Sequence, residues 1–96
     1  MIVRITWGRV KSGQWNEFER AYRTAAEGKN VKGLKTRWLC QDTKDRDGGF
    51  TITLWETEQA MADYEKTEAF QQLKKAVQPF FIDEYNSYTC DWKFSK

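Results

Sequence analysis

The fold is decided by residues 48–81, which read GGFTITLWETEQAMADYEKTEAFQQLKKAVQPFF. Apolar side chains alternate with threonine over Phe50–Trp55, and this period of two predicts a strand. Thr57 follows as a predicted helix N-cap, because its hydroxyl can accept a hydrogen bond from a free backbone N–H of the first turn. Pro79 ends the helical pattern, since it has no N–H to donate. The stretch predicts a strand joined directly to a long amphipathic helical region.

The helical region contains a second predicted start. Apolar side chains recur at helical spacing in two sets, one ending near Lys66 and the other beginning at Phe70. Between the sets, Thr67-Glu68 repeats the pattern of a capping hydroxyl followed by an acidic residue. A kink or an offset is therefore expected near Thr67.

The residues before this stretch form a similar strand and helix. Ile2–Trp7 alternates apolar and mixed side chains and predicts a strand. Gln14–Glu27 predicts a helix that ends at Gly28, a residue suited to a C-terminal cap. One stripe of this helix is apolar and consists of Trp15, Phe18, Tyr22 and Ala25. The stripe indicates a helix that covers a sheet.

Two more strands complete the pattern. Leu34–Gln41 predicts the second strand, and the polar turn Asp42–Gly49 contains Asp47-Gly48, a strong hairpin signal. After the helical region, a period of two over Glu84–Phe94 predicts the last strand. The order of elements is thus βαββαβ.

This order predicts an α+β, ferredoxin-like fold in a single domain of residues 1–96. The sheet is expected to have four antiparallel strands with both helices on one face. The other face would carry Ile2, Arg4, Phe50, Ile52 and Leu54, or the residues that alternate with them. An uncovered, partly apolar sheet face is typical of an association surface, so a homodimer packed sheet to sheet is expected.

Composition excludes several functional classes. The 96 residues carry a formal net charge of +2, with 16 basic and 14 acidic side chains, which is too balanced for a nucleic-acid or anionic-membrane surface. Arg4 interrupts the first apolar run, so this run is not a signal peptide, and no run is long enough to span a membrane. The sequence predicts a cytoplasmic protein.

The chain has no histidine, and this absence removes much chemistry. It excludes imidazole acid–base catalysis, a Ser-His-Asp triad, and histidine-ligated zinc, iron or haem. Cys40 and Cys90 stand alone, without the spacing of a metal site, and are interpreted as small buried apolar residues. No metal site is predicted.

The join Leu54-Trp55-Glu56, followed by TEQAMADYEKTEAFQQLKKAVQPFF, resembles the antibiotic biosynthesis monooxygenase family. The opening MIVRITWGRVKSGQWNEFE is similar in kind to the start of that family. The resemblance implies a dimeric α/β barrel, with a pocket in each subunit between the sheet and the helices. It also implies a monooxygenase without cofactors, because some members oxygenate quinols or aromatic polyketides whose deprotonated form donates electrons to O₂ itself.

The resemblance also concerns individual residues. The family's tryptophan at the end of strand three matches Trp55, which we predict as a catalytic residue or pocket wall with an indole N–H for a substrate oxygen. The asparagine on strand one of the haem-degrading branch is replaced by Thr6 or Trp7. The haem-ligating histidine of that branch would fall in Glu68–Lys75, where none exists, so haem degradation of that type is not expected.

Aromatic side chains are the predicted substrate-binding residues, because a planar aromatic ligand suits apolar walls with few polar groups. The predicted set is Trp7, Phe18, Tyr22, Tyr64, Phe70, Tyr88 and Trp92. The same aromatic residues would also suit a small core. Arg4, Arg37 and Asp91 are polar candidates for the site, although solvent-exposed or dimer-interface charges explain them as well.

Two alternative functions follow from the same pattern. RNA-recognition domains share the βαββαβ order, but they need stacked aromatic side chains on strands one and three. Here strand three offers Phe50 and Ile52, and strand one offers Val3 or Arg4, so nucleic-acid binding is not expected. The remaining alternative is a non-catalytic dimer that binds a small ligand or has a structural role, because no catalytic base is identifiable.

Overall fold

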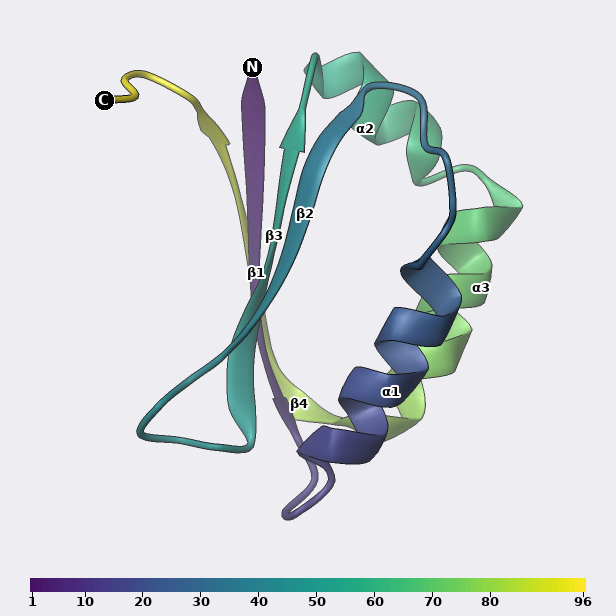
Figure 1. The fold of residues 1–96 in the computed structure, drawn as a ribbon, viewed down its shortest axis with the longest axis vertical. Coiled ribbons are helices and arrows are strands. Elements are labelled where there is room, and N and C mark those ends of the chain that lie inside the picture. Colours follow the sequence, from purple (N-terminus) through teal and green to yellow (C-terminus); the bar gives the residue numbers. More distant parts are fainter.

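A computed structural model describes residues 1–82 and 86–96 with their side chains, and it has the predicted order of elements (Figure 1). The elements are β1 (Ile2–Val10), α1 (Trp15–Ala26), β2 (Leu34–Gln41), β3 (Gly48–Trp55), α2 (Glu58–Tyr64), α3 (Glu68–Val77), the 3-10 helix η1 (Gln78–Phe80) and β4 (Phe81–Asp91). None of the helices among the described residues has the length and apolar character that crossing a membrane requires.

The four strands form one antiparallel sheet in the order β2-β3-β1-β4. All three α-helices lie on the same side of this sheet, and the C-terminal residues extend away from it on the other side (Figure 1). The predicted α+β, ferredoxin-like fold is therefore confirmed.

The predicted interruption near Thr67 is confirmed as a break between α2 and α3. Thr57 Oγ1 accepts a hydrogen bond from the backbone N–H of Ala60 at 3.0 Å. Thr67 Oγ1 accepts one from the N–H of Phe70 at 3.2 Å. Each cap satisfies a backbone donor that the helix leaves free and contributes about 1 kcal/mol. Two caps in succession begin two helices, and this lets the helical layer bend over the sheet.

The last strand does not have its predicted bounds. It spans Phe81–Asp91, whereas the alternation of side chains predicted Glu84–Phe94. Pairing with β1 sets the true limits: Phe81 lies opposite Val10 after an irregularity in register, and Asp91 lies opposite Ile2. Beyond Asp91 there is one more backbone hydrogen bond, in which the N–H of Trp92 donates at 3.0 Å to the carbonyl of Met1, the residue before β1. The ladder therefore ends where its partner strand ends.

A cluster of buried side chains joins α1 to the sheet. Val10, Trp15, Phe18 and Tyr22 are its buried members. The Phe18 ring meets the rings of Trp15 and Phe81 at centroid distances of 5.0 and 5.2 Å in edge-on geometry. The predicted apolar stripe of α1 therefore faces the sheet. This packing holds the helices against the sheet at the lower end of the molecule in Figure 1.

Strand register separates the two faces of the sheet cleanly. Trp7 lies opposite Phe50 and Ile5 opposite Ile52, so these apolar residues share the face that points away from the helices. Arg4 lies opposite Thr53 on the face beneath the helices. The expected grouping of Ile2 and Arg4 with Phe50, Ile52 and Leu54 was wrong, because antiparallel pairing places Ile2 opposite Trp55, on the helix side.

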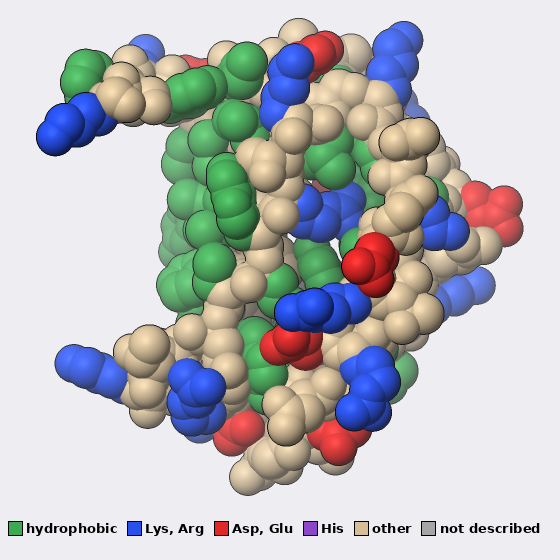
Figure 2. Space-filling model, in the orientation of Figure 1, with side chains coloured by type: hydrophobic (Ala, Val, Ile, Leu, Met, Phe, Trp, Pro, Cys, Tyr) green, Lys and Arg blue, Asp and Glu red, His purple; other side chains and the backbone are tan. Residues whose placement is uncertain are grey.

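The face away from the helices is apolar, and we call it the outer face. Register places these residues on it: Val3, Ile5, Trp7, Trp38, Cys40, Phe50, Ile52, Leu54, Tyr88 and Cys90. Trp38 and Tyr88 are 48% and 59% exposed. Figure 2 shows hydrophobic side chains gathered along this side of the sheet. Cys40 and Cys90 are exposed here as free thiols, so the prediction that they are buried was wrong within one chain.

The close packing of α1 on β3 predicts that a side chain at Gly49 is not tolerated. A Cβ at this position would overlap the carbonyl oxygen of Cys40 and lie 2.6 Å from Trp15 Cη2. We expect Gly49→Ala to lower the free energy of unfolding by about 2 kcal/mol or more, because backbone and core must both shift. Gly48→Ala is the matched control, since its Cβ would meet only Asp45, whose nearest atom is Oδ2 at 3.2 Å. Urea unfolding measures both, and equal losses would contradict the prediction.

Candidate functional site

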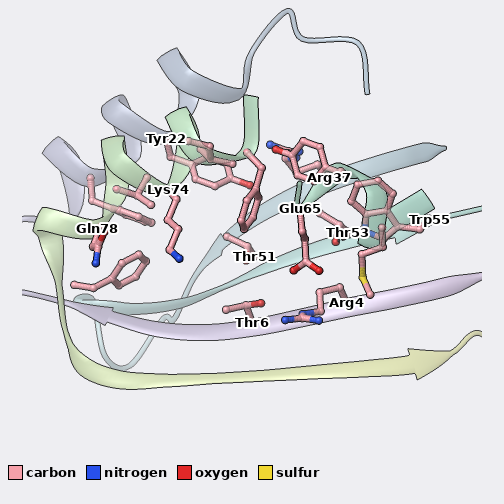
Figure 3. A pocket seen from close by; sticks show the side chains of 17 residues that line it. Arg4, Thr6, Tyr22, Arg37, Thr51, Thr53, Trp55, Glu65, Lys74 and Gln78 are labelled. Atoms are coloured by element: carbon pink, nitrogen blue, oxygen red, sulfur yellow. Dashed lines mark hydrogen bonds between the residues drawn. The ribbon is translucent and has the colours of Figure 1, made fainter. Parts of the chain in front are cut away.

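A cavity of about 530 Å³ lies between the sheet and the helices. Figure 3 shows side chains from both layers pointing into it. The lining residues are Arg4, Thr6, Phe18, Tyr22, Arg37, Thr51, Thr53, Trp55, Met61, Tyr64, Glu65, Phe70, Leu73, Lys74, Val77, Gln78 and Phe81. Every strand and every helix thus contributes at least one residue to the wall.

The sheet supplies a polar floor. Thr51 and Thr53 point to the helix side of β3, because they alternate with the apolar residues of the outer face. Thr6 of β1 lies opposite Thr51 and adds a third hydroxyl, and Thr6 Oγ1 lies 3.1 Å from the hydroxyl oxygen of Ser87. Three hydroxyls on adjacent strands give the floor groups that can both donate and accept hydrogen bonds.

The helices supply an aromatic roof. Tyr64 of α2 is its centre, with ring centroids 5.4 Å from those of both Trp55 and Phe70. Phe18 and Tyr22 of α1 continue the roof, with 6.2 Å between their centroids. The break between α2 and α3 makes this arrangement possible, because it turns Tyr64 and Phe70, on different helices, toward each other with an interplanar angle of 75°.

Trp55 is 2% exposed, and its indole is held by the protein itself. Its Nε1–H donates to Thr53 Oγ1 at 2.9 Å, two residues earlier on the same face of β3. A hydrogen bond from this N–H to a substrate oxygen would therefore require the bond to Thr53 to break. In this structure Trp55 forms one end of the cavity wall, against Tyr64.

Basic side chains outnumber acidic ones in the lining. Arg4, Arg37 and Lys74 line the cavity together with one carboxylate, that of Glu65. Figure 3 shows these groups reaching in from the strands and from the helices. Arg4 donates to Thr89 Oγ1 at 3.1 Å. The excess of positive charge favours a ligand that carries or develops negative charge.

Tyr22 carries a protonated phenol beside Arg37. Burial raises the pKa of Tyr22 above its ordinary value of 10.0, while Arg37 opposes this through its charge and through hydrogen bonding, and Tyr64 adds to the increase. The net direction is upward, because removing an ionised phenol from water costs more than Arg37 returns. Tyr22 is therefore a neutral hydrogen-bonding group at neutral pH.

The structure brings most of the predicted binding residues together. Phe18, Tyr22, Tyr64 and Phe70 line the cavity, as does Trp55. Sequence reasoning did not single out the threonine floor, Glu65 or Lys74. The signal for the floor was present, since the threonines alternate with the apolar residues of β3.

Three predicted binding residues lie elsewhere. Trp7 and Tyr88 are on the outer face, and Trp92 follows the end of β4 and is 43% exposed. Antiparallel pairing places Trp7 opposite Phe50, at the other end of β3 from Trp55 and on the other face. Of the polar candidates, Arg4 and Arg37 line the cavity and Asp91 does not. Within one chain, therefore, the cavity wall does not include Trp7, Tyr88 or Trp92.

Metal-ligating side chains do not gather in the described part of the chain. Among those residues, no group of three His, Cys, Asp or Glu side chains is placed to hold a metal ion. Glu65 is the one carboxylate among the residues of the cavity wall given above.

The raised pKa of Tyr22 predicts a change in stability at high pH. The stability that protonated Tyr22 contributes is complete below about pH 10 and is lost as pH rises through its folded-state pKa, because the unfolded chain ionises first. We expect Tyr22→Phe to reduce the fall in unfolding free energy between about pH 9 and about pH 11. Urea unfolding of the wild type and of Tyr22→Phe across this range tests the effect. An unchanged pH dependence in Tyr22→Phe would refute the prediction.

Comparisons with known proteins place this fold and cavity in context. A comparison with curated proteins finds no significant match. Solved structures match over almost the whole chain. A protein from Nitrosomonas europaea, named "putative antibiotic biosynthesis monooxygenase", has a TM-score of 0.86 at 17% identity and covers 98% of this chain and 100% of its own. A protein of the same name from Bordetella bronchiseptica has a TM-score of 0.86 at 20% identity, with 97% of each chain covered.

A third structure of that name, from Caulobacter crescentus, has a TM-score of 0.87 at 17% identity and covers 97% of this chain and 90% of its own. At these identities the structures show a shared fold. The model of the family described as antibiotic biosynthesis monooxygenase matches residues 1–76, from β1 through most of α3. By this match over most of its length, the chain belongs to the antibiotic biosynthesis monooxygenase family.

Proposed function

We propose that this protein is a cofactor-independent monooxygenase that acts on a small aromatic or quinol compound bound in the cavity. The observation that carries the proposal is the cavity itself, with its aromatic roof, its polar floor and three basic side chains. Membership in the family supports a monooxygenase-type role. The cavity chemistry supports the substrate class.

The shape and chemistry of the cavity suit a planar ligand. Its volume of about 530 Å³ is within the range of small-molecule sites. The rings of Phe18, Tyr64 and Phe70 offer edges and faces to an aromatic ligand. The hydroxyls of Thr51 and Thr53 can orient oxygen substituents on the opposite side.

An anthrone illustrates the reaction that we propose. Its ring CH₂ loses a proton, and the resulting enolate donates electrons to O₂ and forms a carbon–oxygen bond. The peroxide anion then takes up a proton to give a hydroperoxide. The hydroperoxide then loses water to give the quinone, so one oxygen atom enters the product and the other leaves as water. The substrate is the reductant throughout, and the protein provides binding, proton transfer and stabilisation of negative charge.

The lining residues have distinct roles in this scheme. Glu65 is the carboxylate of the cavity wall and is the candidate acceptor for the substrate proton. Arg4, Arg37 and Lys74 stabilise the enolate oxygen by their charge. Trp55 closes one end of the cavity and positions the ring.

Oxygen uptake with a panel of hydroquinones and anthrones tests the activity. We expect uptake by the wild type, and a decrease of about 10- to 100-fold in Trp55→Phe, because the shorter ring loosens the position of the substrate. Trp92→Phe is the matched control, since Trp92 does not line the cavity. In the same assay Glu65→Gln should lower the rate by about 100-fold or more if its carboxylate accepts the proton.

The outcomes separate the two candidate functions. Uptake that Glu65→Gln and Trp55→Phe leave unchanged would contradict the assigned roles. Absence of uptake on every compound would favour the alternative, a non-catalytic protein that binds a small ligand in the same cavity.

We also propose that two copies of the chain pair through their outer faces. A contiguous apolar surface with Trp38 and Tyr88 largely exposed is costly in water, and a second copy presents a matching surface. Trp38 on the edge strand β2 lies opposite Ile52 on the central strand β3, about midway along both strands. Such a dimer leaves both cavities open on the far sides of the joined sheets.

Light scattering during gel filtration tests the dimer. The wild type should have a mass of twice 11.4 kDa. Ile52→Lys should give a monomer, because the two charges would be buried against each other in the paired faces. Gln71→Lys, an exposed substitution on α3, adds the same charge away from the sheet and should leave the dimer intact. A wild-type monomer would disprove pairing through the outer faces.

A further inference from the structure

Arg9 and Arg37 differ in the hydrogen bonds made by one edge of the guanidinium, the edge that carries Nε–H and Nη2–H. Arg9 presents its Nε–H and Nη2–H to the carboxylate of Asp45, with N–O distances of 2.9 and 3.4 Å. On Arg37 the Nη2–H donates to the Tyr64 hydroxyl at a long 3.4 Å, and the guanidinium also hydrogen-bonds Tyr22. The Nε of Arg37 is buried and has no hydrogen-bond partner in the described part of the chain.

A buried charged donor without an acceptor destabilises the protein that contains it. Among residues 1–82 and 86–96, no carboxylate lies within ion-pair distance of Arg37, and this includes Glu65 of the same cavity. The aromatic groups around Arg37 compensate only in part, with the Tyr64 ring centroid 5.7 Å from the guanidinium carbon. An acceptor from outside the chain would complete this group.

Arg37 stands where such an acceptor can reach it. With Tyr22 it lines both the main cavity and a second hollow of about 460 Å³ between α1 and β2. In Figure 2, Lys or Arg side chains are visible in the space between the sheet and the helices. Figure 3 shows Arg37 at the helix side of β2, in the same part of the wall as Tyr22. The guanidinium thus forms part of the wall between the aromatic cavity and the surface.

We propose that Arg37 binds the carboxylate of an aromatic acid whose ring lies in the cavity beneath Tyr64 and Phe70. A planar carboxylate matches the two parallel donors of the Nε/Nη2 edge, as Asp45 matches them on Arg9. Two-point binding requires the Tyr64 hydroxyl to move off the edge that it now holds at 3.4 Å. The proposal deepens the proposed function and rests on it only for the aromatic part of the ligand.

Calorimetric titration with 2-naphthoate and 2-naphthamide tests this assignment, because the two compounds share one ring system and differ in charge. The wild type should bind the acid about 10- to 100-fold more tightly than the amide. Arg37→Gln should reduce this preference to about twofold or less. Arg20→Gln is the matched control, since it removes an equal charge from the exposed surface of α1 and should keep the preference.

Arg37→Lys serves as a second variant, and it decides the matter if Arg37→Gln does not fold by circular dichroism. It keeps the charge but replaces the two-donor edge with a single ammonium, so most of the preference should be lost. Equal binding of acid and amide by the wild type, or no binding of either, would overturn the proposal. It would equally be overturned by a full preference in Arg37→Lys or Arg37→Gln, which would assign the acid to Arg4 or Lys74.

The titration is independent of turnover, so it separates this proposal from the proposed function. If the wild type prefers the acid through Arg37 but takes up no oxygen with any compound, the carboxylate site is supported and the monooxygenase activity is refuted. Oxygen uptake on neutral hydroquinones without acid preference would do the reverse.

Discussion

The alternation of side chains along β1 and β3 is the constraint on which the rest of the structure depends. In the middle of both strands the residues beneath the helices are polar, as Arg4, Thr6 and Thr53 show, and the residues on the outer face are apolar. A sheet covered on one side by helices usually turns its apolar side toward them. Here the pattern is reversed, so the helices cannot pack closely along the whole sheet. A cavity with a polar floor and an unpaired apolar outer face are two consequences of one register.

The helices remain attached because their apolar contacts are concentrated at one end. Trp15 packs on Gly49, where a Cβ would overlap it, and Phe18 fills the space between α1 and Phe81. At the other end Trp55 of β3 and Met61 of α2 are buried. Between these two anchors the layers separate, and the aromatic roof of Tyr64 and Phe70 spans the gap. The cavity is therefore held open by rigid aromatic packing at both ends.

The charged side chains of this cavity link the fold of the family to the ligand that we propose for this chain. The shared fold of the relatives, at identities of 20% or below, does not extend to individual side chains. In this chain an arginine on β2 has a buried donor without a partner among the described residues, and it lies beside a tyrosine that burial keeps protonated. Both groups line the cavity, and both are supplied by elements that the core holds in place. Recognition can thus vary through side chains of the floor while the scaffold stays the same.

The sequence by itself determined the order of elements, the break near Thr67 and the family resemblance, because hydrophobic period, capping hydroxyls and the hairpin turn are local signals. Four predicted aromatic residues also line the cavity, since the stripes of the helices face the sheet. Tertiary structure alone decided that Trp7 lies opposite Phe50 and not beside Trp55. It also decided that Arg9 pairs with Asp45, whereas Arg37 Nε has no hydrogen-bond partner among the described residues. Register and partner choice depend on pairing between distant strands, and no single strand carries that information.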